Sequence, residues 1–379
     1  MQNHRIVLCP SAYYPSLGGV EEICRNLAKT LAASGNQVVI AVNRHPEDLP
    51  ASEHLHGVDV RRFPFKYPNR SVSGLRELLA MPINIANFLL FVQSYQPDII
   101  HVICPSSNSL YCYVAKILFG KKLLVTLQGE FFMDAGDIYG KSAFARFGAQ
   151  KLLEVADGVT ACSNYVLTDA KNRFAFESPV EKVVFNGVDL NEKSVPIPLV
   201  LPKKFVFGVG RLVENKGFDD LIAAYDKLRA VVPDVDLVIA GAGPYADKLK
   251  ELCVDRNLND RVHFVGRQDR ASVSDLFSKC LFFVLPSHFE PFGIVCLESM
   301  RAGKAVIASD IGGPPEFIKN NETGLLFEPR SIESLFEKML ALCSDDKLRE
   351  TLGKNAKAMS KNFGWTEISK SYEALYEQI

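Results

Sequence analysis

The chain alternates strand-length apolar runs with amphipathic stretches, and it does so twice. In the first half, the apolar run 6–9 is followed by a segment of helical period at 20–34 and another apolar run at 38–42. This order is typical of βαβ units, which build parallel sheets covered by helices. Further strands of the first half are expected at residues 58–63, 99–103, 123–127, 159–161 and 183–185.

A proline-rich segment separates the two halves. Residues 194–202 contain three prolines and show no helical period, so we interpret residues 193–203 as a linker. The alternation then restarts, with strands expected at residues 205–209, 237–240, 262–265, 281–285 and 305–308. We predict an α/β protein with two domains, residues 1–192 and 204–363, each built on a doubly wound parallel sheet.

The composition excludes several classes of protein. With 379 residues, 47% of them hydrophobic, the chain can form two cores, and a net charge of −1 argues against a nucleic-acid partner. Nine cysteines without a C-x-x-C pair predict free, reduced thiols. The most apolar stretch, residues 80–92, is too short to cross a bilayer and carries Asn84 and Asn87. We therefore expect a cytoplasmic protein.

Residues 287–298 place two acids around a Pro-Phe-Gly turn. Glu290 precedes the turn, and Glu298 lies on the helix expected at residues 293–301. The turn follows the apolar run 280–286, so it lies at the carboxyl end of a strand, where open α/β sheets bind ligands. The alternative interpretation is a helix cap and a solvated helix residue.

The start of this helix suits an anion. Backbone N–H groups of Phe292, Gly293 and Ile294 would point outward, and the helix dipole favours negative charge there. Gly293 allows close approach of a ligand to the backbone. The helix rises about 9 Å from Phe292 to Glu298, which could hold one polar group at each end of a diphosphate.

Two more loops carry residues suited to phosphate. Arg211 and Lys216 share one glycine-containing loop after the first strand of the second half, although solvated charges on a turn would explain the same pattern. Gly18 and Gly19 join the first strand to the first helix and could approach a ligand, or simply form a flexible turn. All three loops are expected to line a cleft between the two sheets.

Seven motifs, in this order, mark a resemblance to a known family: the Gly18-Gly19 loop, Phe185-Asn-Gly-Val-Asp189, Gly210-Arg211 with Lys216-Gly217, Gly241-Ala-Gly-Pro244, Val262-His-Phe-Val-Gly266, Glu290-Pro-Phe-Gly293 with Glu298, and Gly312-Gly313 with Glu316. Through nearly its whole length the chain resembles the retaining glycosyltransferases of the GT-B fold, family 4 (glycosyl transferases group 1). The resemblance implies two facing Rossmann-like domains with a cleft between them. It also implies that the C-terminal helix, residues 364–379, packs back on the first domain.

The resemblance further implies roles for individual residues. Arg211 and Lys216 would neutralise the diphosphate of a nucleotide-sugar, and Glu290 would face the donor sugar; these three are the candidate catalytic residues. Glu298 would accept hydrogen bonds from the ribose, and the base would lie near Gly266. The candidate donor-binding residues are Gly18, Gly19, Gly266, Arg267, Phe292, Gly293, Ile294 and Glu298.

The implied reaction is transfer of a sugar, with retained anomeric configuration, from a nucleotide diphosphate sugar to an acceptor. A UDP-sugar is the expected donor, and the acceptor is a glycan, a lipid-linked sugar or a small molecule. One alternative is a nucleotide-sugar epimerase of the same fold, which would use the donor without an acceptor. The other is a non-catalytic scaffold that binds nucleotide or carbohydrate.

The chain departs from the family at one strand end. Many relatives have a T-x-H pattern there, whereas this chain has Thr126-Leu-Gln128-Gly-Glu130. An amide cannot shuttle protons, so a histidine-dependent role is in doubt. Gln128 or Glu130 could instead contact donor or acceptor, as could His288 beside Glu290; an ordinary loop acid is the alternative for Glu130.

No metal or other cofactor is expected. The D-x-D sequence formed by Asp234 and Asp236 leads into a strand and is interpreted as a strand start. His54 and His56 lack further ligands nearby and are interpreted as surface residues, and His263 as structural.

Acceptor specificity is expected in loops 66–73 and 131–141 of the first domain. Basic residues mixed with aromatic ones precede the apolar helix expected around residues 78–92: Arg61, Arg62, Lys66, Arg70 and Arg76, with Phe63, Phe65 and Tyr67. They could rest on the anionic inner face of the cytoplasmic membrane, or form a solvated loop over a core helix.

Overall fold

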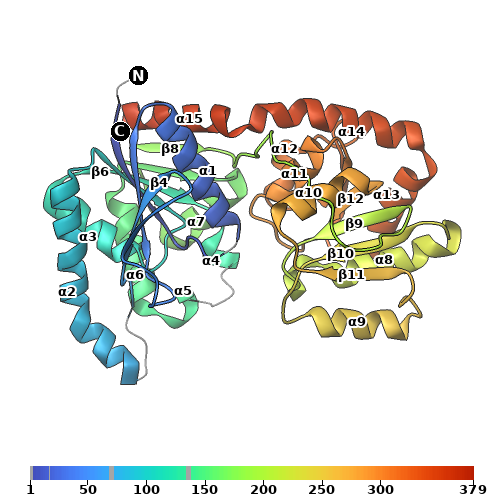
Figure 1. Ribbon diagram of the computed structural model, residues 1–379, viewed down its shortest axis with the longest axis horizontal. Coiled ribbons are helices and arrows are strands. Elements are labelled where there is room, and N and C mark those ends of the chain that lie inside the picture. The colour runs from blue at the N-terminus through green and yellow to red at the C-terminus, as the bar shows by residue number, and fades with distance from the viewer. Residues whose placement is uncertain (1–2, 17, 68–71, 134–137) are drawn as a thin grey trace. The chain divides into compact units, whose positions relative to one another are not determined.

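The structure is a computed structural model that describes residues 3–16, 18–67, 72–133 and 138–379. The chain forms two compact units (Figure 1): unit 1 comprises Met1–Asn186 and Trp365–Ile379, and unit 2 comprises Gly187–Gly364. Arg70 and part of each predicted acceptor loop, residues 68–71 and 134–137, lie outside the described residues.

Unit 1 is built on one sheet with the strand order β3-β4-β2-β1-β5-β6-β7-β8. All neighbouring strands are parallel except β3 and β4. The strands are β1 (Arg5–Pro10), β2 (Gln37–Asn43), β3 (Ser52–Leu55), β4 (Val58–Phe63), β5 (Ile99–Ile103), β6 (Lys122–Leu127), β7 (Gly158–Ala161) and β8 (Val180–Val183). The helices are α1 (Gly19–Ala33), α2 (Val72–Tyr95), α3 (Ser109–Phe119), α4 (Glu130–Met133), α5 (Ile138–Lys141), α6 (Ala143–Val155), α7 (Asn164–Phe174) and α15 (Trp365–Gln378).

Unit 2 has a six-stranded parallel sheet with the order β11-β10-β9-β12-β13-β14. The strands are β9 (Phe205–Val209), β10 (Asp236–Ala240), β11 (Val262–Gly266), β12 (Phe282–Leu285), β13 (Ala305–Ser309) and β14 (Leu325–Phe327). The helices are η1 (Glu214–Lys216), α8 (Phe218–Val231), α9 (Ala246–Asp255), α10 (Arg270–Lys279), α11 (Ile294–Arg301), α12 (Pro314–Phe317), α13 (Ile332–Ser344), α14 (Asp346–Ser360) and η2 (Lys361–Phe363).

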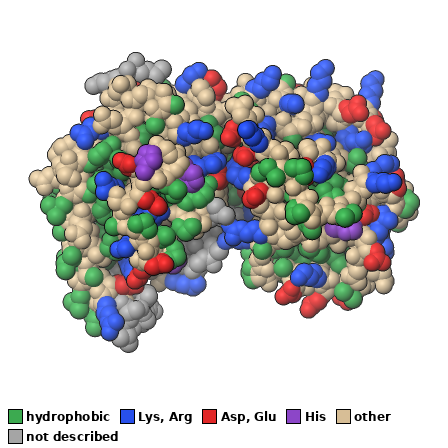
Figure 2. All heavy atoms as spheres, viewed as in Figure 1, with side chains coloured by type: hydrophobic (Ala, Val, Ile, Leu, Met, Phe, Trp, Pro, Cys, Tyr) green, Lys and Arg blue, Asp and Glu red, His purple; other side chains and the backbone are tan. Residues whose placement is uncertain are grey.

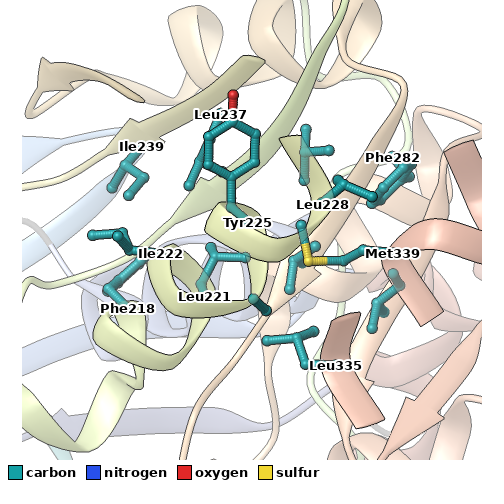
Figure 3. Close-up of a cluster of buried hydrophobic side chains, with 14 of the residues drawn as sticks. Phe218, Leu221, Ile222, Tyr225, Leu228, Leu237, Ile239, Phe282, Leu335 and Met339 are labelled. Carbon is teal, nitrogen blue, oxygen red and sulfur yellow. The ribbon is translucent and has the colours of Figure 1, made fainter. Parts of the chain in front are cut away.

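The prediction of two doubly wound α/β sheets is confirmed, because in both units strands alternate with helices and the first strand lies in the interior of its sheet. In unit 2, apolar side chains of α8 and α13 pack with those of β10 and β12 (Figure 3). Tyr225 is fully buried in this core, where its hydroxyl donates to the carbonyl oxygen of Val235 at 3.0 Å. This core holds the carboxyl ends of the unit 2 strands in fixed positions.

Several predicted boundaries change in the structure. The strand expected at residues 183–185 is β8, which ends at Val183, and β3 and β14 were not predicted. β3 is a short edge strand whose residues are all exposed or half-buried, so it lacks the apolar run used to find strands. The predicted linker belongs to unit 2, since Val195 donates to the Ala271 carbonyl at 3.1 Å and Ile197 to the Asp275 carboxylate at 3.3 Å.

The C-terminal helix α15 packs on unit 1 through a buried polar network. The two ring nitrogens of His101 lie 2.8 Å from the Tyr376 hydroxyl and 2.7 Å from the Thr126 hydroxyl. His101 is fully buried, and burial lowers its pKa to about 3. A neutral imidazole therefore joins β5 and β6 to α15.

The nine cysteines are free thiols, and all but the half-buried Cys343 are buried, as expected. One expectation about membranes is wrong. Helix α2 is longer than the predicted apolar segment, and its part Gly74–Tyr95 is long and apolar enough to cross a bilayer by length and composition. Its two ends lead into β4 and β5 of the same sheet, however, so α2 serves as the connection between two strands of a folded unit.

Candidate active site

The loops at the carboxyl ends of the unit 2 strands are packed against one another through glycines. A Cβ atom on Gly241, after β10, would lie 1.9 Å from the carbonyl oxygen of Gly210, after β9. A Cβ atom on Gly312, after β13, would lie 2.0 Å from the carbonyl oxygen of Glu290, after β12. Both glycines also have a positive φ, so any other residue would strain the backbone and displace the neighbouring loop.

Lys216 and Glu290 form an ion pair between two of these loops. The Lys216 ammonium donates to Oε2 of Glu290 at 2.7 Å, and the side chains are 16% and 9% exposed. The Ser287 hydroxyl donates to the same carboxylate oxygen at 3.0 Å. The structure thus brings two of the three predicted catalytic side chains into direct contact, and it adds Ser287, which sequence reasoning missed.

Two contacts of backbone atoms fix the position of Lys216. The N–H of His288 donates to the Asn215 carbonyl at 2.9 Å. Gly217, with φ of +64°, packs so closely on the strand end that a Cβ atom would lie 2.1 Å from the carbonyl oxygen of Pro286. As a result η1 is held against the segment that carries Glu290.

Helix α11 begins beside this ion pair. Its N-cap residue is Gly293, with φ of +88°, and the helix starts at Ile294, one residue later than predicted. The side chain of Phe292 is buried, with its ring centroid 4.9 Å from that of Phe317. The first-turn N–H groups of a helix have no intrahelical acceptors, so this end of α11 can bind an anion.

Arg211 and the Gly266-Arg267 turn lie at the same edge of the sheet. The side chain of Arg211 is exposed and has no hydrogen-bond or ion-pair partner in the described part of the chain. Gly266 ends β11 with φ of +70°, and its carbonyl accepts from the Gly241 N–H at 2.8 Å. Arg267 is exposed. The same edge of the sheet therefore carries two exposed arginines, Arg211 after β9 and Arg267 after β11, as well as the buried Lys216–Glu290 pair.

Glu298 is engaged by a cation that sequence reasoning missed. Arg270 donates to Oε1 of Glu298 at 2.6 Å, and its Nε lies 3.4 Å from Oε2 of Glu192. The Glu298 side chain is 13% exposed, which rules out the solvated helix residue of the alternative interpretation. Arg270 lies 28 residues away in sequence, and no local pattern marks such a pair.

His288 lies with two acids at the start of α8. Its Nε2 is 2.8 Å from Oδ2 of Asp220. The ligand atoms of Asp219, Asp220 and His288 all lie within 4.8 Å of one another, the one group in the described residues that could hold a metal ion. The two acids of the D-x-D sequence have other partners. Asp234 pairs with Lys204, and Asp236 pairs with Arg261 and His263.

In unit 1, the structure separates the roles of Gln128 and Glu130. The amides of Gln128 and Asn186 bond reciprocally, at 3.1 and 2.8 Å, so Gln128 fixes the last segment of unit 1. Glu130 is not an ordinary loop acid: it is 9% exposed, and its Oε2 accepts from the Gln128 N–H at 2.6 Å. Burial raises its pKa to about 8.

The predicted glycines of unit 1 lie at the start of its first helix. Gly18 is the N-cap of α1 and Gly19 its first residue, and both are exposed. A Cβ atom on Gly18 would lie 2.8 Å from a carboxylate oxygen of Glu21. That oxygen is the end of a flexible side chain and the backbone at Gly18 is extended, so the contact does not by itself require glycine there. The predicted role of both glycines in phosphate binding stays a prediction.

Family models match both halves of the chain. The model of glycosyltransferase family 4 matches residues 17–192, and the model of glycosyl transferases group 1 matches residues 191–359. The chain is 26% identical to the N-acetyl-alpha-D-glucosaminyl L-malate synthase of Bacillus anthracis, over 97% of this chain and 95% of that protein.

Solved structures show the same fold. A sucrose-phosphate synthase from Thermosynechococcus elongatus superposes with a TM-score of 0.81 at 24% identity, over 99% of this chain and 98% of that one. Anabaena Alr3699/HepE, solved with UDP, gives a TM-score of 0.78 at 20% identity, over 99% and 100%. With its two Rossmann-like units and both family models matched in order, the chain belongs to the GT-B glycosyltransferases of family 4, the glycosyl transferases group 1.

Proposed function

We propose that this glycosyltransferase transfers a sugar from a UDP-sugar to an acceptor hydroxyl with retention of anomeric configuration and without a metal ion. The observation that carries the proposal is the Lys216–Glu290 pair at the start of α11, with the exposed guanidinium of Arg211 at the same sheet edge. Two cations and a helix N-terminus suit a diphosphate. That Anabaena HepE was solved with UDP supports uridine as the nucleoside.

In the proposed reaction, the bond between the anomeric carbon and the diphosphate oxygen breaks. Negative charge then grows on the diphosphate, where Arg211 and Lys216 stabilise it. The acceptor oxygen bonds to the anomeric carbon on the same face, and its proton passes to the leaving phosphate oxygen. Glu290, held by Lys216 and Ser287, would accept a hydrogen bond from a hydroxyl of the donor sugar.

The remaining donor contacts are proposed from their places in unit 2. The ribose hydroxyls would donate to the Glu298 carboxylate, whose charge is already balanced by Arg270. The base would stack near the exposed Gly266-Arg267 turn. Backbone N–H groups at Phe292, Gly293 and Ile294 would meet the phosphate.

A donor screen tests this function. UDP-, GDP- and ADP-sugars are incubated with a panel of sugar and polyol acceptors, release of nucleoside diphosphate is measured, and the anomeric configuration of the product is read by NMR. We expect turnover of a UDP-sugar, an α-linked product from an α-linked donor, and full activity in EDTA. Loss of activity in EDTA with recovery in Mg²⁺ would instead assign a metal to Asp219, Asp220 and His288.

A further inference from the structure

Arg270, the first residue of α10, lies between two carboxylates of unit 2. One of its terminal guanidinium nitrogens donates to Oε1 of Glu298 on α11 at 2.6 Å. Its Nε lies 3.4 Å from Oε2 of Glu192, in the segment before β9. The side chains of Arg270, Glu298 and Glu192 are 27%, 13% and 19% exposed. One largely buried cation is therefore shared by two acids, and the shorter of its two contacts is with Glu298.

This ion pair differs from the exposed ion pairs of unit 2. Figure 2 shows acidic and basic side chains interspersed over the face of unit 2 that it presents. An exposed pair such as Lys250 and Asp247, with side chains 57% and 91% exposed, contributes little because water screens the charges. Without Arg270, in contrast, the Glu298 charge would be only partly compensated by water. Arg270 thus favours the ionised form of Glu298.

The start of α10 is fixed in place. Its N-cap is Asp269, whose Oδ1 accepts from the Ser272 N–H at 2.8 Å. This cap holds the backbone of Arg270, which follows the Gly266-Arg267 turn by three residues. The turn to which we assign the base of the donor and the cation that contacts Glu298 therefore belong to one short, structured segment.

Arg301 joins the other segments that carry this arrangement. Its guanidinium, at the end of α11, donates to the Ser274 hydroxyl of α10 at 2.9 Å. It also donates to the carbonyl oxygens of Asp189 and Glu192 at 3.0 and 3.4 Å. Helices α10 and α11 and the segment with Glu192 are thereby held together. On this frame, the 2.6 Å bond from α10 fixes the Glu298 carboxylate.

A carboxylate held in this way is a prepared acceptor for two hydroxyl groups. Its two oxygens offer about four acceptor sites in all, so the bond from Arg270 leaves capacity for a ligand. A protonated carboxyl would lose part of that capacity, and a mobile one would have to be ordered when the ligand binds. Pairing with Arg270 reduces both costs.

We propose that Arg270 is a positioning residue for the donor nucleotide: it holds Glu298 ionised and in one orientation for the two ribose hydroxyls. Arg270 acts on the nucleotide through Glu298, and together they make the site select a nucleotide with both hydroxyls. This inference rests on the proposed function, because it takes Glu298 as the ribose contact.

A general structural role of Arg270 would have a different signature. If the arginine only held α10 to α11, its loss would weaken the binding of every nucleotide by the same factor. A role through Glu298 instead changes binding only where a ribose hydroxyl is present. Comparing UDP with dideoxy-UDP, which lacks both ribose hydroxyls, separates the two roles.

Calorimetric titration of the full chain with these two nucleotides tests the proposal. We expect the unchanged chain to bind UDP at least about tenfold more tightly than dideoxy-UDP, because a site built for hydroxyl groups rejects a ligand without them. Arg270→Met should weaken UDP binding about tenfold and leave dideoxy-UDP binding within about twofold. Arg270→Lys keeps the charge but not the planar guanidinium, so it should restore part of the loss.

Four further variants complete the experiment. Arg270→Met combined with Glu298→Gln should bind UDP no more weakly than Glu298→Gln alone, since both act on one contact. Arg270→Met combined with Glu192→Gln removes one acid with the cation and serves if Arg270→Met alone does not fold. The matched control is Arg256→Met, at an arginine that pairs with Asp226 at 3.1 Å, and it should bind both nucleotides as the unchanged chain does.

The outcomes distinguish this inference from the proposed function. Arg211→Ala removes a proposed diphosphate contact, so it should weaken UDP and dideoxy-UDP by the same factor. If that holds but Arg270→Met retains the full preference for UDP, or weakens both nucleotides equally, the role of Arg270 is overturned and the donor site stands. If the unchanged chain binds neither nucleotide, the proposed UDP-sugar donor is overturned, and the inference with it.

Discussion

Lys216 and Glu290 are joined by a 2.7 Å ion pair that links the loop after β9 to the loop after β12. The pair is largely buried, so each side chain fixes the position of the other and neutralises its charge. A lysine ammonium has three donor hydrogens, and one bond to Glu290 leaves donors for a phosphate. The same pair can therefore stabilise unit 2 and bind a ligand.

Because of this double role, substitutions at Arg211 and Lys216 should both lower transfer but differ in their effect on stability. Arg211→Ala removes an exposed side chain, so we expect transfer to fall about a hundredfold with unchanged thermal unfolding. Lys216→Ala should lower transfer similarly and also destabilise unit 2 by about 3 kcal/mol, because Glu290 is left buried without its cation. Steady-state kinetics and calorimetric unfolding measure the two effects. Unchanged turnover in both variants would exclude the diphosphate assignment.

The Gln128–Asn186 amide pair predicts a structural role for Gln128. Gln128→Ala should destabilise unit 1 by about 1–2 kcal/mol, since it leaves a largely buried amide unpaired. Asn186→Ala should cost a similar amount, and the double variant less than the sum of the two. Denaturant unfolding monitored by Trp365 gives the three values. Strict additivity would show that the two amides act independently, in conflict with the structure.

The raised pKa of Glu130 predicts that the stability of unit 1 falls as pH rises. The folded carboxyl keeps its proton up to about pH 8, whereas in the unfolded chain it loses the proton near its ordinary value of 4.5. Its contribution is therefore complete below about pH 4.5 and is lost as pH rises to 8, by up to about 1.4 kcal/mol per pH unit. Glu130→Gln should flatten this dependence between pH 6.5 and 8, measured by urea unfolding. A slope equal to that of the unchanged chain would contradict the pKa assignment.

His101 predicts the opposite dependence at lower pH. Its imidazole stays neutral in the folded chain down to about pH 3, whereas the unfolded chain takes up the proton near pH 6.5. Stability is thus complete above about pH 6.5 and falls as the solution is acidified, by about 2 kcal/mol at pH 5. His101→Gln keeps hydrogen-bonding groups without this titration, so its stability should change less between pH 6.5 and 5. Glu130→Gln, which retains His101, serves as the control for unit 1.

Glycine packing predicts which substitutions disturb the site without touching its charges. Gly312→Ala would bring a methyl group against the Glu290 carbonyl, so the loop must move, and we expect transfer to fall at least tenfold. Gly120→Ala is the matched control, because Gly120 also has a positive φ but no atom lies within 4 Å of the added Cβ. Similar losses of transfer in both variants would point to backbone strain rather than loop displacement.

The sequence alone determined the two sheets, the order of their strands along the chain and the edge at which Arg211, Lys216 and Glu290 lie. Apolar runs and glycine turns are local signals, and parallel strands bring the residues that follow them to one edge. β3 was not predicted because this exposed edge strand has no apolar run. β8 was placed three residues late, at residues 183–185, because the apolar residues there continue past the end of the strand.

Only the tertiary structure decided which charged groups are paired. Arg270 meets Glu298, and Asp220 meets His288, over separations of 28 and 68 residues. Gln128 is held by Asn186, while Glu130 is buried with a raised pKa. α2 proved to be exposed where a core helix was the simpler expectation. Composition and periodicity report which residues prefer burial, but pairing and exposure depend on which distant segments pack against them, and that is fixed only when the chain is folded.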